Sequence, residues 1–363
     1  MRLLFGSVAA LFVSTLSPSS PRLANALRAQ QTEARSAGEW IVTRDPFADL
    51  WFHSLAVIGY EGYGPLGLYD ARYAERVVAA KTRAHVKTTL DRRAVALRDR
   101  LTADSAFEVL HFLPLYFVGQ DPTLVLAALR NAIRGDVPGS GRRSPLSAAT
   151  IIAAALPTAQ ERGVMSALID AVEDEWVAFL RVDRTSRATQ DRNTAQALQS
   201  SWNERFAPVL QAYLTPMGIE RGRILISPAI GTEGRFVREA NGAVVIVVSS
   251  DAGAAAHAPL HALVSELAFP LLDQLHAPLS AATPRVAAAQ ARDAAAVRAG
   301  AILLDALDAP LAAEYRRHFV DAIGGRSFER AYPLSNEAEM ELKRLVTSAI
   351  RGAVSGRTSY ENY

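Results

Sequence analysis

Two short stretches rich in Ile and Val interrupt a chain that otherwise shows helical patterns, and a long apolar helix pattern follows the second stretch directly. The stretches are "RILISPAI" (223–230) and "GAVVIVVSS" (242–250). β-Branched residues favour strands, and the Asn-Gly pair between the stretches is a hairpin turn signal. The sequence therefore predicts a small antiparallel sheet of two or three strands over about residues 223–249.

The rest of the sequence predicts helices on both sides of this sheet. The first helix pattern, "DPFADLWFHSLAVIGY", begins with Asp45 as an N-cap and Pro46 at the first helical position. We therefore expect a mainly α (α+β) fold. It would comprise an N-terminal helical region at 45–222, a region of strands and helices at 223–354, and a flexible tail at 355–363.

The N-terminus has the pattern of a secretory signal. Arg2 precedes an apolar run, and the small-residue motif "ANA" ends at Ala26. We expect a signal peptide at 1–26, cleaved near Ala26, a linker at 27–44, and export to the periplasm or the extracellular space. An uncleaved N-terminal anchor is the alternative. No later stretch is long enough to cross a bilayer, which predicts no transmembrane span in the mature chain.

Composition excludes several classes of function. The formal net charge is +2, from 39 basic and 37 acidic residues, so the charge balance indicates no nucleic-acid partner. The chain has no cysteine, which excludes disulfides, thiolate metal sites and cysteine nucleophiles. It also lacks a G-x-S-x-G nucleophile motif. Any metal site must therefore use His, Asp and Glu side chains.

The helix pattern that follows the strands, "HAPLHALVSELAFPLLDQL" (257–275), contains two histidines one helical turn apart. Imidazoles at positions i and i+4 project from one helix face, as a helical metal site requires. Pro259 belongs in a first helical turn, so His257 would lie at or before the start of the helix. In this interpretation His257 and His261 bind zinc or another transition metal, with Asp251 or a distant acid as the third ligand.

A second register on the same helix leads to the opposite conclusion. In "SELAF", Glu266 stands at the general-base position of an H-E-x-x-H motif, while Ser265 and Phe269 stand at the two ligand positions. Phenylalanine cannot bind zinc and serine is a poor ligand. In this register the metal is absent and Glu266 is an inactive, structural acid.

From Asp45 to about Ile323, the order of elements resembles that of bacterial gluzincin-like metallopeptidase domains. The segment "LHALVSELAFPLL" matches the frame of their zinc-binding helix. The segment "DAAAVRAGAIL" is similar to their third-ligand helix, in which Arg298 and Ala299 match an Arg-Ala pair. In that helix Ala294–Ala296 occupy the place where the resemblance leads one to expect a glutamate, and Asp293 is the nearest acid. The resemblance implies a zincin-like region at 223–354 in which all three ligand positions have been replaced.

Two functions are consistent with these patterns. The first is an exported pseudo-metallopeptidase without a working zinc site and without a cofactor, which acts as a binding or scaffold domain for a peptide or a cell-envelope ligand. The alternative is a metal-dependent hydrolase, a peptidase, with zinc at a displaced site on His257 and His261.

Overall fold

The computed structural model describes residues 40–61, 67–135, 153–239, 242–251, 257–276, 279, 285–325 and 327–352. The expected signal peptide at 1–26 and the expected tail at 355–363 lie outside these residues. Within the described ranges, every helix is too short or too polar to cross a bilayer.

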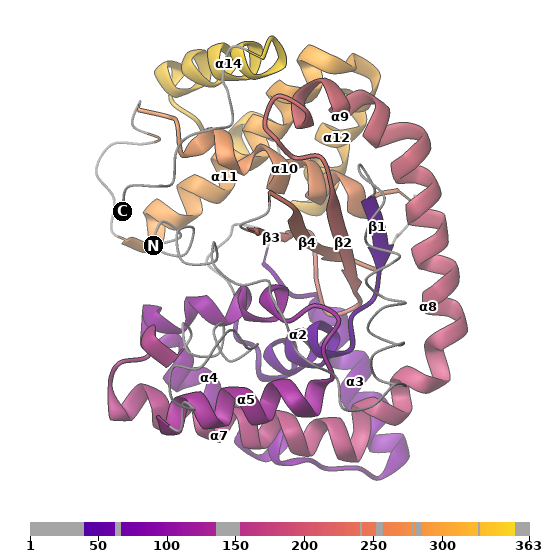
Figure 1. The fold of residues 1–363 in the computed structure, drawn as a ribbon, viewed down its shortest axis with the longest axis vertical. Helices are drawn as coiled ribbons and strands as arrows, with labels where there is room; N and C mark the ends of the chain where they lie inside the picture. The colour runs from indigo at the N-terminus through magenta and orange to yellow at the C-terminus, as the bar shows by residue number, and fades with distance from the viewer. Residues whose placement is uncertain are drawn as a thin grey trace, which may run out of the picture.

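One mixed sheet of four strands lies between two groups of helices (Figure 1). The strands are β1 (Trp40–Thr43), β2 (Gly222–Ser227), β3 (Arg235–Arg238) and β4 (Val244–Ser249), arranged in the order β1-β2-β4-β3. Strands β1, β2 and β4 are parallel, and β3 pairs antiparallel with β4. The mainly helical fold was predicted correctly.

The prediction of an antiparallel sheet of two or three strands was wrong. Only the β3–β4 pair, which the Asn-Gly signal predicted, is antiparallel. All six residues of β4 are buried, as expected for a strand in the middle of a sheet that is covered on both faces. Strand β1 lies in the expected linker at 27–44, and its partner β2 is far away in the sequence, so no local pattern could reveal the pairing.

The sheet separates two hydrophobic cores. Successive residues of a strand point to opposite faces. In β4, Val245 and Val247 therefore join the core of the N-terminal helices, while Val244, Ile246 and Val248 join the core of the C-terminal helices. The sheet therefore lies between the two groups of helices and contributes side chains to both cores.

The N-terminal group packs around one central helix, α2 (Pro46–Ile58), whose residues are nearly all buried. Its start agrees with the prediction, because the Asp45 carboxylate accepts a hydrogen bond from the Ala48 N–H at 2.8 Å and Pro46 occupies the first turn. The surrounding elements are α3 (Ala71–Ala84), α4 (Thr89–Thr102), two 3₁₀ segments (Ser105–His111 and Leu113–Tyr116), α5 (Pro122–Arg134) and α7 (Ala159–Glu175).

A continuous helical run connects the two groups. After α7, a π-helical turn (Trp176–Leu180) leads into α8 (Arg181–Ser201), and a second one (Trp202–Phe206) leads into α9 (Ala207–Leu214). Figure 1 shows α8 along one side of the molecule, passing from the N-terminal helices to the C-terminal helices. The second π-helical turn lies next to the start of the apolar helix described below.

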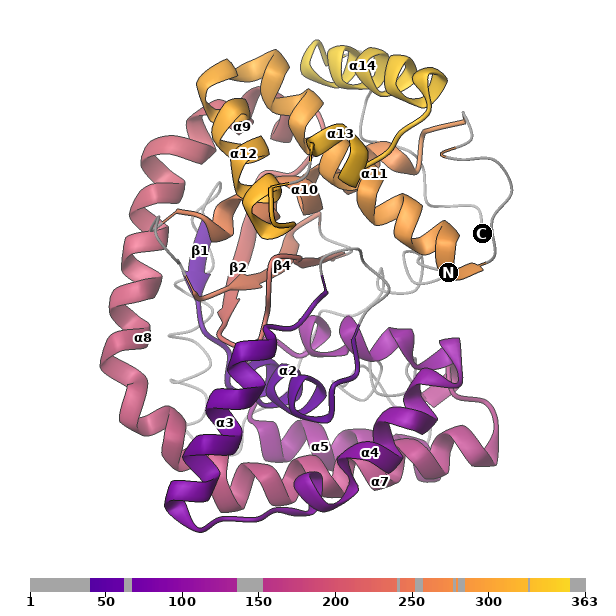
Figure 2. The same cartoon turned by 180° about the vertical axis from the view of Figure 1, so that it is seen from behind.

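The C-terminal group is built on α10 (Pro259–Leu272), in which every residue except Pro270 is buried. The other helices of this group are α11 (Arg285–Leu307), α12 (Ala309–Ala322), α13 (Phe328–Ala331) and α14 (Asn336–Ile350). Figure 2 shows all five at the same end of the molecule. Tyr315 of α12 lies against Gly300 of α11, where a Cβ atom would collide with its ring, and its hydroxyl donates to the Val297 carbonyl at 2.9 Å. This close packing fixes the face of α12 that meets α10.

Candidate functional site

Helix α10 carries both groups of residues that the sequence singled out. Pro259 is the first residue of the helix, and His257 lies in the turn just before it, as the position of the proline predicts. His257 and His261 face α12, whereas Ser265 and Glu266 line a cavity beside β3 and α11. The two registers therefore belong to two separate places on one helix.

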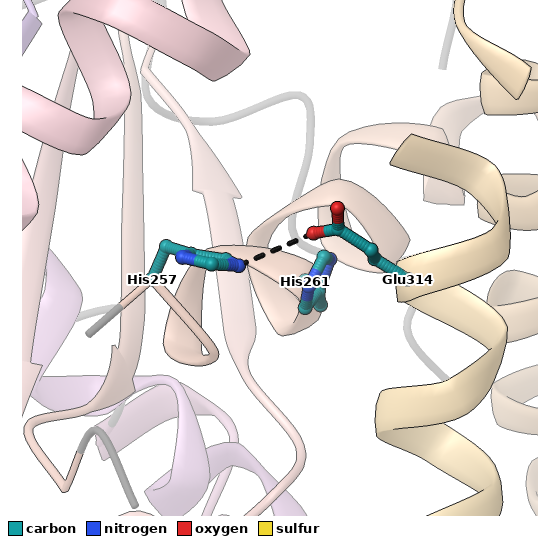
Figure 3. A group of neighbouring side chains, drawn as sticks. All are labelled: His257, His261 and Glu314. Atoms are coloured by element: carbon teal, nitrogen blue, oxygen red, sulfur yellow. Dashed lines mark ion pairs between the residues drawn. The ribbon is translucent and has the colours of Figure 1, made fainter. Parts of the chain in front are cut away.

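At the start of α10, the structure brings a carboxylate to the two histidines. One possible ligand atom from each of His257, His261 and Glu314 lies within 4.8 Å of the other two. Nε2 of His257 and Oε2 of Glu314 are 3.3 Å apart. Figure 3 shows the three side chains converging, with Glu314 reaching over from α12. Among the described residues, the carboxylate next to the two histidines is therefore that of Glu314 and not that of Asp251.

Arg205 lies against the same group of atoms. Its Nη1 is 3.2 Å from Nε2 of His257, and its Nη2 is 2.5 Å from Oε1 of Glu314. Because arginine can only donate hydrogen bonds, Nε2 of His257 accepts in this contact. The lone pair of that nitrogen is therefore directed into the cluster, and the guanidinium supplies the counter-charge for the Glu314 carboxylate.

A third histidine adjoins the cluster. His318 lies one turn after Glu314 on α12, and its ring centroid is 5.2 Å from that of His261. Nδ1 of His261 and Nε2 of His318 are buried and have no hydrogen-bond partner among the described residues. Burial, aided by the other histidines and Arg205, lowers the pKa of His261 to about 3. Burial and His257 lower the pKa of His318 to about 4, against the opposing effect of Asp321. Both imidazoles are therefore neutral at pH 7.

The cluster is buried on one side and open on the other. His261 is 2% exposed, whereas the side chains of His257 and Glu314 are 25% and 32% exposed. The buried histidine has a fixed direction, and the two outer groups are reached from solvent. A small ion or molecule could therefore contact all three groups without opening the core.

The second place on α10 is a small cavity that contains a buried arginine. Its lining residues come from β3 and the segment before it, and from α10, α11 and α12. They are Glu233, Arg235, Ser265, Glu266, Asp293, Ala296, Val297 and Phe319. Glu266, Ser265 and Asp293 thus share one cavity. The resemblance implies the general-base position for Glu266 and a ligand position for Ser265, with Asp293 as the acid nearest to the third ligand position. We call Arg235 together with Glu233, Glu266 and Asp293 the arginine centre.

Arg235 is held in this cavity by charge and by backbone contacts. Burial alone would lower the pKa of Arg235, but the carboxylates of Glu233, Asp293 and Glu266 outweigh it and raise the pKa above its usual value. Its Nη1 donates to the Gly234 carbonyl at 2.7 Å. A Cβ atom at Gly234 would lie 2.9 Å from Cγ of Glu266, so only glycine lets the start of β3 approach α10 this closely. The guanidinium is thereby fixed beside Glu266.

The two residues at the ligand positions that the resemblance implies make other contacts. The Ser265 hydroxyl donates to the Ala262 carbonyl of its own helix at 2.7 Å. The Phe269 ring lies under the Arg292 guanidinium, 4.9 Å from its centroid. Arg298, one member of the Arg-Ala pair, forms ion pairs with Glu329 and Glu339. None of these three side chains is arranged to bind a metal at the arginine centre.

Sequence reasoning missed four residues that shape these places, namely Arg205, Arg235, Glu314 and His318. One signal was present, because Glu314 and His318 have the same one-turn spacing as His257 and His261. Arg205 and Arg235 gave no signal, since both come from short irregular or edge segments and meet α10 only in the fold.

Comparison of the chain with protein-family models, with curated proteins and with solved structures gave no significant match. The resemblance to gluzincin-like domains therefore stays a prediction.

Proposed function

We propose that this chain is a gluzincin-like pseudo-metallopeptidase that acts by binding, with the arginine centre in place of a zinc site. The observation that carries the proposal is the buried guanidinium of Arg235 in the same cavity as Ser265, Glu266 and Asp293. A side chain of this chain, and not a metal ion, supplies the positive charge beside the general-base position.

The donor set at the arginine centre does not suit zinc. Structural and catalytic zinc sites use three or four His, Cys or carboxylate ligands around one point. Here Ser265 bonds to its own helix, and Phe269 has no lone pair to offer. The carboxylates of Glu233, Glu266 and Asp293 do not form a group that could hold a metal ion, because among the described residues only the two histidines and Glu314 do so. Hydrolysis by a general base such as Glu266 also requires a metal-activated water in these enzymes. Arg235 can pair with the carboxylates, but a guanidinium has no open coordination position for water.

A peptide is the ligand class that we favour. Strand β3 is at the edge of the sheet and pairs with β4 on one side. Extended peptides bind proteins by adding a strand to such an edge, through backbone hydrogen bonds. Arg235 begins this strand, so a peptide added along β3 would run past the arginine centre. Export, indicated by the pattern that ends at Ala26, would place this surface in the periplasm or outside the cell.

Peptide hydrolysis by the untagged mature chain, with and without added zinc, tests the proposal. We expect no zinc-dependent cleavage of an unfolded protein substrate. Zinc-dependent cleavage that disappears in Glu266→Gln, but persists in Glu337→Gln on the exposed face of α14, would overturn it. Binding is measured separately with a library of extended peptides.

A second candidate is a metal-dependent hydrolase at the displaced site, and the approach of Glu314 to His257 and His261 favours it. The same assay separates the two candidates. Cleavage by this site would be lost in His257→Ala and retained in Glu266→Gln. Cleavage at the arginine centre would show the reverse pattern.

A further inference from the structure

We infer that His257, His261 and Glu314 form a binding site for a divalent transition-metal ion, and that the guanidinium of Arg205 competes with the ion for two of the three ligands. We call these three residues the histidine cluster. This inference goes beyond the proposed function, which concerns the arginine centre, and does not depend on it.

The spacing of the possible ligand atoms is close to what an ion requires. Nitrogen and carboxylate ligands lie about 2.0–2.2 Å from zinc, so two ligands of one tetrahedral ion are about 3.4 Å apart. His257 Nε2 and Glu314 Oε2, at 3.3 Å, already have this spacing. One possible ligand atom from each of the three residues lies within 4.8 Å of the other two, so the largest closure needed is about 1.4 Å. A rotation of the partly exposed Glu314 or His257 side chain provides it.

The ligand types select the class of ion. Ca²⁺ and Mg²⁺ take oxygen ligands, while imidazole suits Zn²⁺, Ni²⁺, Co²⁺, Cu²⁺ and Fe²⁺. Two imidazoles and one carboxylate therefore indicate a transition-metal ion. With three protein ligands, the remaining coordination positions would be open to water or to a ligand group. They would face solvent, because His257 and Glu314 form the open side of the cluster.

The cluster contains a buried nitrogen that has no hydrogen-bond partner among the described residues. A buried polar atom without a hydrogen bond costs about 1–3 kcal/mol. Nδ1 of His261, in a residue only 2% exposed, has no partner in the described part of the chain. The neighbouring Nε2 of His318 has none either. Binding of an ion by Nδ1 of His261 would offset the cost of leaving this nitrogen without a partner.

Arg205 competes with a metal ion for the ligands of the histidine cluster. Its guanidinium contacts Nε2 of His257 and Oε1 of Glu314, two of the proposed ligand residues. A divalent cation and a guanidinium repel each other, so the ion must displace Arg205 toward solvent. Removing the positive charge with a shorter, neutral polar side chain, as in Arg205→Gln, should therefore tighten metal binding.

Two titrations of the untagged mature chain test the inference. Binding of Zn²⁺ is measured by calorimetry, and binding of Co²⁺ is measured by visible absorption. We expect one ion per chain. Loss of an outer-shell partner typically weakens metal binding by about 10–100-fold, and loss of a direct ligand should cost at least as much. His257→Ala and Glu314→Gln are the main variants, because both side chains are partly exposed and the fold should tolerate them. His276→Ala, an exposed histidine after α10, is the control.

Two further variants make the result specific. Arg205→Gln should bind more tightly than the natural chain, while Arg317→Ala, which removes an exposed positive charge from α12, should not. Glu266→Gln should leave the stoichiometry unchanged. Absence of binding, or equal binding by His257→Ala, Glu314→Gln and the natural chain, would overturn the inference. Binding lost in Glu266→Gln and kept in His257→Ala would place the metal at the arginine centre, and would overturn the proposed function as well.

Discussion

Each half of the molecule contains a group of buried ionisable side chains around a histidine, and the two groups differ in how completely they are hydrogen-bonded. In the N-terminal half, His53, Lys81 and Glu175 form a closed network. In the C-terminal half, the histidine cluster and His318 contain buried nitrogens that have no partner among the described residues. Both groups lie against well-packed hydrophobic cores, so burial alone does not distinguish them.

The N-terminal network satisfies its members from several helices. Nδ1 and Nε2 of His53 lie 2.8 Å from the Tyr73 hydroxyl and from Glu175 Oε1. The other oxygen of Glu175 accepts from Lys81 at 2.7 Å and from the Thr88 hydroxyl at 2.6 Å. Burial tends to raise the pKa of Glu175, but His53 and Lys81 reverse this and hold it below its usual value.

The contrast indicates different roles. A fully bonded buried network fixes how helices pack and has no donor or acceptor left for a ligand. A cluster with orphaned nitrogens and an open side retains capacity to bind.

Lys81→Met should destabilise the protein by about 3–5 kcal/mol, because it leaves the buried Glu175 carboxylate without its counter-charge. Urea unfolding of the variant measures this change in the free energy of unfolding. Lys343→Met is the control, since Lys343 forms an exposed i,i+4 pair with Glu339 and such pairs contribute at most about 1 kcal/mol. Equal effects of the two substitutions would show that the network is not structural.

The two groups should also respond to acid in different pH ranges. The folded pKa values of His261 and His318, about 3 and about 4, lie below the ordinary value of 6.5. The unfolded chain therefore binds protons first as the pH falls below about 6.5, and each histidine lowers stability from there toward its folded pKa. At pH 5 this amounts to about 2 kcal/mol per histidine. Glu175, with a lowered pKa, contributes stability that is lost only at pH values below about 4.5.

Urea unfolding at pH 7 and pH 5, with a chelator present, measures this loss. His318→Asn should remove about half of the decrease, whereas His276→Asn on the surface should leave it unchanged. A natural chain that is equally stable at both pH values would mean that the two imidazoles are already charged in the fold, and that they are not desolvated as the structure shows.

The sequence predicted those features that depend on local pattern. Helix α10, the strand-rich segment and the Asp45 cap follow from spacing, turn residues and capping chemistry within a few positions. His257 and His261 were paired for the same reason, because both are near the start of one helix. Glu314, Arg205 and Arg235 were missed because each reaches α10 from another element, and the position of that element depends on packing. Strand β1 was missed because a four-residue strand is defined by its distant partner.

Zinc should stabilise the natural chain if the histidine cluster binds it. An ion present at 100 times its dissociation constant raises the free energy of unfolding by about 2.7 kcal/mol, provided that it binds only the folded chain. Thermal unfolding with zinc and with a chelator measures the difference. Glu314→Gln should abolish it, and Glu266→Gln should retain it. Stabilisation that survives Glu314→Gln would assign the ion to other residues.

The smallest expected effect is the change in stability of His257→Ala without metal. The His257 side chain is a quarter exposed, and its partners Arg205 and Glu314 keep their own ion pair when it is removed. Substitutions at such positions usually change stability by about 0.5 kcal/mol or less, well below the effect expected for Lys81→Met. The same substitution should nevertheless remove all of the stabilisation by zinc. Urea unfolding with a chelator and with zinc gives both values. A residue that contributes little to folding but is required for metal-linked stability is a ligand, whereas a large loss in chelator would place His257 with the structural network instead.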